Sequence, residues 1–218
     1  MRIVLFGATG RTGQPLIDQA LERGHEVVAF VRDTAGLPQA VRDDSHVTVV
    51  EGDAYNGEDV ARAIAGDGHP VDAVVSVLGQ TSDGPDDLLT VAGGHALAAM
   101  DTHGVERLVT LVGAGVREEG ESVSLGGKIM GALLKLLARA ALEDARDHVE
   151  MVRESGTQWT VVRGPRLTED AHTGEFRHGT DLTLGMRDAA SRANVAEFIL
   201  DCLEADRYVH EMPKIADR

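Results

Sequence analysis

Seven residues near the N-terminus have the types and the spacing that bind phosphate groups. They read GATGRTG at residues 7–13, with a glycine at every third position. Glycine lets the backbone turn sharply and approach a ligand closely. A helix that starts directly after such a turn presents unpaired N–H groups and the positive end of its dipole to phosphate oxygens. The pattern therefore predicts a pyrophosphate-binding turn formed by Gly7, Thr9, Gly10, Arg11, Thr12 and Gly13.

Two apolar runs and one amphipathic segment have to position this turn. Residues 3–6 and 27–31 are continuous apolar runs, typical of parallel strands that helices cover on both faces. Between them, apolar residues recur at helical spacing, and Gly24 ends the helical pattern. Strand, glycine turn, helix and strand follow one another as in a dinucleotide-binding unit. A unit whose glycines only turn the chain is the alternative.

A charged pair, Arg32 and Asp33, follows the second apolar run, where such units hold the adenosine ribose. A guanidinium pairs with a 2′-phosphate, so Arg32 favours NADP, and Arg11 would add a second positive charge. Asp33 argues for NAD, because a carboxylate accepts hydrogen bonds from a free 2′-hydroxyl, unless it turns away or caps the next helix. We predict a preference for NADP(H) over NAD(H). The alternative for Arg32 is a solvated charge at a strand end.

Strand and helix patterns alternate along the rest of the chain, which predicts an α/β fold. We expect a Rossmann-type, doubly wound parallel sheet in a single domain, residues 1–218, with a small C-terminal elaboration. Residues 1–115 would form the cofactor half and residues 116–218 the substrate side. The expected strands are 47–50, 72–78, 107–112, 159–162 and 208–212, and the expected helices are 57–65, 87–103, 140–154 and one that Ser191 or Asn194 caps.

One further segment, residues 128–137, is markedly apolar. Such segments usually mark packing, so core or a subunit contact, and with it a homodimer, is the main interpretation. A lid over the substrate is the alternative.

Charge and composition limit the classes of partner. The formal net charge is −15 and basic residues are not clustered, so nucleic acid is not expected as a partner. No apolar run approaches the ~20 residues of a membrane span, and the N-terminus does not read as a signal peptide. The single cysteine, Cys202, fits a reducing compartment, and we expect a cytoplasmic protein. The acidic surface is either a salt adaptation or an ordinary acidic surface.

Five stretches resemble the atypical short-chain dehydrogenase/reductase group. Within it they are similar to the NAD(P)H-binding proteins related to NmrA and to biliverdin reductase B, a flavin reductase. The stretches are residues 7–13, 31–33, 51–53, 154–167 and 191–196. The resemblance implies that Asp53 and Ala54 border the adenine and that Leu78 and Gly79 pass beside the ribose and pyrophosphate. Val112 and Gly113 end the fifth expected strand, close to where a nicotinamide should lie, and a plain core and turn position is the alternative for their side chains.

The residues that ordinary short-chain dehydrogenases use for acid catalysis are not found at their usual spacing. Their Tyr-x-x-x-Lys pair is absent, because Asp59 and Met212 stand four residues after Tyr55 and Tyr208. Gly113 stands where the active-site serine is expected. This favours hydride transfer to a flavin, a quinone or a similar planar acceptor, which delocalises charge and takes its proton from water. A non-catalytic NADP(H)-binding sensor of NmrA type is the alternative.

Three polar residues are candidates for the neighbourhood of the nicotinamide. His148 would act as an acid or base, and a surface histidine is the alternative. Arg166 stands where biliverdin reductase B has a histidine and would orient an anionic acceptor, and an ion pair with an acidic residue is the alternative. Arg163 precedes it on the same strand. The histidines lack metal-ligand spacing, so no metal is expected.

Overall fold

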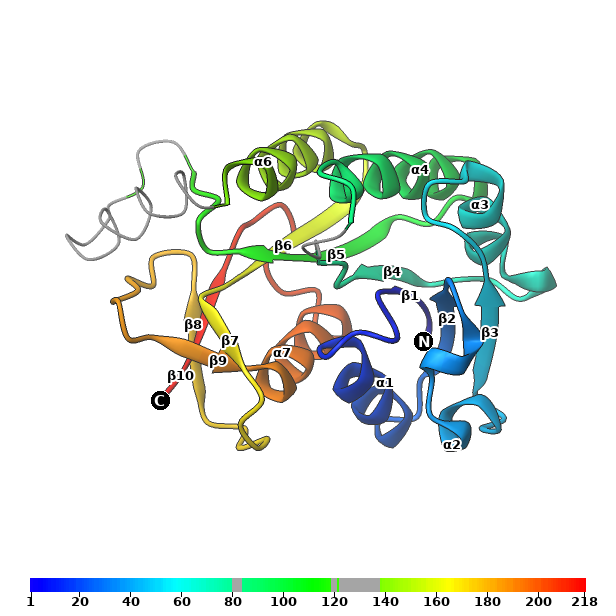
Figure 1. The fold of residues 1–218 in the computed structure, drawn as a ribbon, viewed down its shortest axis with the longest axis horizontal. Coiled ribbons are helices and arrows are strands. Elements are labelled where there is room, and N and C mark those ends of the chain that lie inside the picture. Colours follow the sequence, from blue (N-terminus) through cyan, green and yellow to red (C-terminus); the bar gives the residue numbers. More distant parts are fainter. Residues whose placement is uncertain (80–83, 119–120, 122–137) are drawn as a thin grey trace.

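The central feature of the computed structural model is a sheet whose strand order is β3-β2-β1-β4-β5-β6-β10-β8 (Figure 1). The structure describes residues 1–79, 84–118, 121 and 138–218. Neighbouring strands of this sheet pair in parallel, except β10 and β8, which pair antiparallel. The predicted doubly wound parallel sheet is therefore confirmed, with an antiparallel strand at one edge. The strands are β1 Arg2–Phe6, β2 Glu26–Val31, β3 Val47–Glu51, β4 Ala73–Ser76, β5 Arg107–Gly113, β6 Gln158–Gly164, β8 Phe176–Gly179 and β10 Lys214–Asp217.

Helices cover both faces of this sheet, which explains why its central strands are apolar throughout. One face carries α1 Gly13–Glu22, α2 Gln39–Arg42 and α7 Arg192–Glu204, and the other carries α3 Gly57–Ala65, α4 Leu88–His103 and α6 Arg139–Glu154 (Figure 1). Along β1, Leu5 packs into the core with α1 and α7, whereas Phe6 packs into the core with α3 and α4. The alternation of side chains along a strand thus serves two cores.

Local signals set the helix boundaries close to the predicted ones. The Ser191 hydroxyl accepts a hydrogen bond from the Asn194 N–H at 3.1 Å, so Ser191 is the N-cap of α7. Gly104 follows α4 in the left-handed conformation, with φ at 71°, which ends that helix. Among the described residues, no helix is both long and apolar enough to cross a membrane.

The C-terminal part differs from the prediction. The expected strand at residues 208–212 is wrong, because Tyr208 and His210 adopt left-handed conformations with φ at 58° and 61° that interrupt an extended run. The last strand is β10, beyond Pro213, where it pairs with β6 and β8. A separate two-stranded parallel sheet, β7 Arg166–Thr168 and β9 Ala189–Ser191, lies before α7. The apolar segment 128–137 lies outside the described residues.

Candidate functional site

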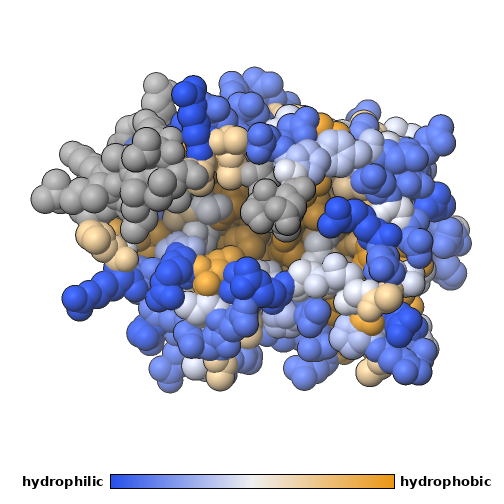
Figure 2. Space-filling view, in the orientation of Figure 1, coloured by the Kyte–Doolittle hydropathy of each residue, from blue (hydrophilic) through white to orange (hydrophobic). Residues whose placement is uncertain are grey.

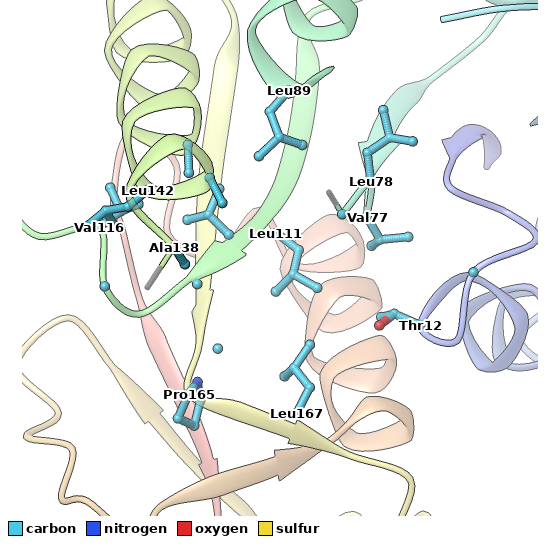
Figure 3. Close-up of a pocket in the computed structure, with 18 of the residues that line it drawn as sticks. Thr12, Val77, Leu78, Leu89, Leu111, Val116, Ala138, Leu142, Pro165 and Leu167 are labelled. Atoms are coloured by element: carbon cyan, nitrogen blue, oxygen red, sulfur yellow. The ribbon is translucent and has the colours of Figure 1, made fainter. Parts of the chain in front are cut away.

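A pocket of about 510 Å³ opens at the carboxyl ends of the central strands. Its walls come from the turn after β1, the ends of β4, β5 and β6, and the first residues of α6 and α7 (Figure 3). The hollow has an apolar floor between hydrophilic rims (Figure 2). The strand order reverses between β1 and β4, and sheets of this type bind ligands at that position.

The turn after β1 is closed so tightly that its glycines cannot be replaced. A Cβ on Gly13 would lie 2.1 Å from the Gly7 carbonyl oxygen and 2.8 Å from the Ala8 Cα. Gly7 has φ at +87°, and its Cβ would lie 2.9 Å from the Val77 carbonyl carbon. Gly10 donates its N–H to the Gly7 carbonyl at 2.9 Å. Glycine is therefore required here by both conformation and space, as the sequence predicted.

The same turn leaves hydrogen-bond donors free. The N–H groups of Arg11, Thr12 and Gly13 have no acceptor among the described residues. Thr12 is the N-cap of α1, yet its side chain makes no capping hydrogen bond. Free N–H groups at the start of a helix form an anion site, and the pyrophosphate of a dinucleotide fits it.

The segment after β2 explains the charged pair of the sequence. The Asp33 carboxylate accepts a hydrogen bond from the Ala35 N–H at 2.8 Å and caps the short helix Thr34–Gly36, which is one of the two alternatives that the sequence left open for it. Arg32 is exposed and makes no hydrogen bond or ion pair with the described residues. A Cβ on Gly36 would lie 2.9 Å from the Thr9 Cγ2, so this segment packs against the glycine turn.

The segment after β3 is also held close to its strand. Asp53 donates its N–H to the Asp59 carboxylate at 3.0 Å, and its own carboxylate accepts the Tyr55 N–H at 3.0 Å. Asp53 is exposed, and Ala54 is buried beside it. Their contact with the adenine stays a prediction.

The predicted cofactor residues fall into two groups. Those that line the pocket are Gly10, Arg11, Thr12, Leu78, Gly79, Val112 and Gly113. Those that lie in the turn behind it or after the neighbouring strands are Gly7, Thr9, Gly13, Arg32, Asp53 and Ala54. The first group meets at one place because all these parallel strands end at the same edge of the sheet.

His148 lies in the protein interior, so its interpretation as a surface histidine is wrong. It is 3% exposed, and its Nε2 lies 3.0 Å from the Thr110 hydroxyl. It borders a separate small cavity that shares Leu78 with the main pocket, and it is not among the residues that line the main pocket. Burial lowers the pKa of His148 to about 4, partly opposed by the Asp144 carboxylate. The position therefore does not favour contact with a nicotinamide or an acceptor.

The two predicted arginines are also placed outside the pocket. Arg166 is exposed at the start of β7 and does not line the pocket. It forms no ion pair with any described residue. Arg163 is completely buried within β6 and donates to the carbonyl oxygens of Met212 and Val116. It also pairs with the Glu121 carboxylate at 2.5 Å. Since Val116 lines the pocket, Arg163 supports the wall rather than facing the ligand.

Most of the residues on the acceptor side of the pocket carry no signal in the sequence. Leu89 of α4, Leu142 of α6 and Leu167 of β7 line the pocket with Leu111, and Arg192 reaches it from the start of α7. The motif around Ser191 contains Arg192, but only the docking of α7 shows that this side chain borders the pocket. Among the described lining residues, the polar side chains are Arg11, Thr12 and Arg192.

Neither tyrosine belongs to this lining. The Tyr55 hydroxyl donates to the Asp87 carboxylate at 2.6 Å, and burial together with that carboxylate raises the pKa of Tyr55 to about 12. The Tyr208 hydroxyl lies 2.8 Å from His178 Nδ1. Within the described ranges, no group of three or more histidine, cysteine, aspartate or glutamate residues could hold a metal ion.

The parallel sheet, the glycine turn with free N–H donors and the pocket at the strand ends define a Rossmann-type dinucleotide-binding protein. The model of the NAD(P)H-binding family matches residues 7–206, and the chain belongs to this family. Two uncharacterised relatives cover it almost completely. A chloroplast protein of Arabidopsis thaliana is 26% identical over an alignment of 236 positions, which covers 100% of this chain and 77% of the relative. YwnB of Bacillus subtilis is 24% identical, over 97% of this chain and 96% of the relative.

Solved structures show the same fold. The anaerobilin reductase ChuY from Escherichia coli O157:H7 has a TM-score of 0.81 at 20% identity, over 100% of this chain and 97% of the other. A short-chain dehydrogenase/reductase from Veillonella parvula, solved in complex with NADP, has a TM-score of 0.78 at 18% identity, over 99% and 94% of the two chains. The chain thus belongs to an NAD(P)H-binding family and shares its fold with these oxidoreductases, and the predicted resemblance to atypical short-chain dehydrogenases/reductases is confirmed.

Proposed function

We propose that this protein is an NADPH-dependent reductase that transfers a hydride to a flavin, a quinone or a similar planar acceptor. The observation that carries the proposal is the composition of the pocket. Its described lining is mostly aliphatic and contains no carboxylate, histidine, tyrosine or lysine side chain. Such a site offers no proton donor for an isolated carbonyl group, whereas a conjugated ring spreads the incoming charge and takes a proton from water.

The chain's own residues bind and orient the two reactants. The turn at Gly10 and Thr12 holds the pyrophosphate, and the backbone at Val112 and Gly113 lies beside the nicotinamide. When bound, the reduced nicotinamide supplies one hydride, which with one proton from water reduces the acceptor by two electrons and leaves oxidised NADP. Leu111, Leu142 and Leu167 offer apolar surface to a flat ring. Their contribution is to hold donor and acceptor in contact and to exclude water, which is an effect of orientation.

The preference for NADP(H) is part of the proposal. Arg32 is free to meet a 2′-phosphate, and Asp33 is engaged in capping the next helix. The anaerobilin reductase named among the structural neighbours supports the wider idea of a conjugated acceptor. Homodimer formation, a cytoplasmic location and the lack of nucleic-acid and membrane partners stay predictions from the sequence.

The test is NADPH oxidation with FMN, riboflavin and menadione, with NADPH binding measured in parallel by fluorescence. Turnover of at least one acceptor is expected. Tight NADPH binding without turnover of any acceptor would contradict the reductase and favour the non-catalytic sensor of NmrA type. The same lack of a proton donor in the pocket is compatible with that alternative.

A further inference from the structure

We infer that Arg192, together with Arg11, binds an anionic group of the acceptor, so that the protein selects planar acceptors carrying a phosphate, sulfonate or carboxylate. The inference rests on the proposed function, because it names the substrate class of the same pocket. It goes beyond that function in assigning specificity to a residue at the start of α7.

The local structure fixes the position of Arg192. It is the first residue of α7 and follows the Ser191 N-cap, and Ser191 pairs with Thr168 in the small β7–β9 sheet. The side chain of Arg192 is half-buried and lines the pocket, as does Leu167 of the small β7–β9 sheet that precedes α7. It makes no hydrogen bond or ion pair with any described residue.

The charges around Arg192 favour an anion. Burial lowers the pKa of Arg192, and the nearby positive charge of Arg11 lowers it further. The Glu169 carboxylate acts in the opposite direction. Glu169 is already bound to Arg11 at 2.9 Å. Two guanidinium groups therefore lie near a single carboxylate, and only Arg11 forms an ion pair with it. This local excess of positive charge contrasts with the formal charge of −15 of the whole chain. An incoming anion would relieve the repulsion and could accept two parallel hydrogen bonds from a guanidinium.

The location favours the acceptor over the cofactor as the source of this anion. The pyrophosphate has its own donors in the free N–H groups of Arg11, Thr12 and Gly13 at the start of α1. Arg192 instead follows β9 directly in the chain. Leu167 of β7, the strand that pairs with β9, lines the same pocket (Figure 3). An acceptor ring that lies on the aliphatic residues would bring an attached anionic group to this edge.

FMN and riboflavin provide the test, because they share the isoalloxazine ring and differ by a phosphate. We compare the wild type with the Arg192→Gln and Arg146→Gln variants. Arg146 is an exposed residue of α6 outside the pocket lining and serves as the control. For Arg192→Gln we expect kcat/KM to fall about 10-fold or more with FMN and less than about 2-fold with riboflavin. The NADPH dissociation constant of Arg192→Gln should equal that of the wild type. The Arg146→Gln variant should show wild-type kcat/KM with both acceptors. Naphthoquinone sulfonate and menadione provide a second pair of charged and neutral acceptors with related rings.

Three outcomes would overturn the inference. Equal losses with charged and neutral acceptors, or weaker NADPH binding in Arg192→Gln, would mean that Arg192 serves the cofactor or the fold. An unchanged preference would remove its role altogether. If the wild type reduces no acceptor, the proposed reductase function is contradicted. Calorimetric binding of FMN and riboflavin to the NADP⁺-loaded protein then tests the anion site by itself. Stronger binding of FMN that Arg192→Gln abolishes supports the anion site, and equal or absent binding contradicts it.

Discussion

Arg11 Nη1 donates a hydrogen bond to Glu169 Oε1 at 2.9 Å and so joins the glycine turn to the segment after β7, 158 residues later in the chain. The sequence analysis placed Arg11 beside a 2′-phosphate as a second positive charge. In the structure its guanidinium instead bonds to the C-terminal part, near Arg192. The inferred anion site therefore assigns Arg11 to the electrostatics of the acceptor side.

Replacing Glu169 tests this assignment. Both partners of the Arg11–Glu169 pair are largely exposed, with side-chain exposures of 72% and 64%, so the pair contributes little to stability. Glu169→Gln removes the carboxylate that competes with an anionic acceptor, and we expect the KM for FMN to fall about 2- to 5-fold. The KM for riboflavin should stay constant. Glu175→Gln, an exposed carboxylate outside the pocket lining, is the control, and an unchanged KM for FMN in Glu169→Gln would contradict the prediction.

The proposed preference for NADPH assigns the 2′-phosphate to Arg32. A charge-assisted hydrogen bond contributes about 1.5–3 kcal/mol, so Arg32→Ala should reduce the preference for NADPH over NADH about 10- to 100-fold. The change should appear as weaker NADPH binding with little effect on NADH, measured by fluorescence titration of both nucleotides. Arg42→Ala, an exposed arginine at the end of α2, should leave both dissociation constants unchanged. An equal preference before and after Arg32→Ala would refute the assignment.

The glycine turn has no room for a single methyl group at Gly13. Because the added Cβ would lie 2.1 Å from the Gly7 carbonyl oxygen, Gly13→Ala must displace backbone atoms. We expect a loss of about 1–3 kcal/mol in the free energy of unfolding, with loss of NADPH binding. Gly156→Ala is the matched control, since nothing lies within 4 Å of its added Cβ and no positive φ is involved. Thermal unfolding of both variants distinguishes the two sites, and equal stability would contradict the expected close contact.

Arg163, the buried cation under the pocket wall, donates to the carbonyl oxygens of Met212 and Val116 and pairs with the carboxylates of Glu121 and Glu118. Arg163→Met would leave the carbonyl oxygens of Met212 and Val116 without this donor and would leave Glu121 with Lys214 as its ion-pair partner. Removing one member of a buried ion pair costs about 3–5 kcal/mol, and we expect a loss in that range in urea unfolding. Arg146→Met on the exposed face of α6 should change stability by less than about 0.5 kcal/mol. A similar loss in both variants would argue against the buried network.

The buried His148 should make the free energy of unfolding depend on pH. Its pKa is lowered to about 4 in the folded protein by burial, against an ordinary value of 6.5, so the unfolded chain binds the proton more readily. The contribution is therefore complete above pH 6.5 and is lost as the pH falls from 6.5 towards 4. At pH 4.5 it should have decreased by roughly 2–3 kcal/mol.

The measurement is urea unfolding at pH 4.5 and 7.5. His148→Gln should lose less stability between these two pH values than the wild type, whereas His46→Gln, at an exposed position, should behave as the wild type. An unchanged pH dependence in His148→Gln would show that the buried imidazole does not control it.

The parts of the fold that were predicted correctly depend on short-range patterns. Continuous apolar runs gave the buried parallel strands, helical spacing gave α1, α3, α4 and α6, and Ser191 was recognised as a possible cap. The error at residues 208–212 arose because an apolar and aromatic composition does not reveal left-handed backbone at Tyr208 and His210. The boundary between a cofactor half and a substrate side at residue 115 stays untested.

The sequence alone determined the cofactor turn, because its requirements are local: glycine at fixed positions, a strand before it and a helix after it. Only the tertiary structure decided the acceptor side. The direction of a side chain depends on how its element packs, and this packing buries His148 under α4, turns Arg163 inward and leaves Arg166 outside. The pairing of β7 with β9 and the docking of α7 bring Arg192 to the pocket beside Arg11. The Arg11–Glu169 hydrogen bond beside them joins residues 158 positions apart, and no local pattern in the sequence specifies such a contact.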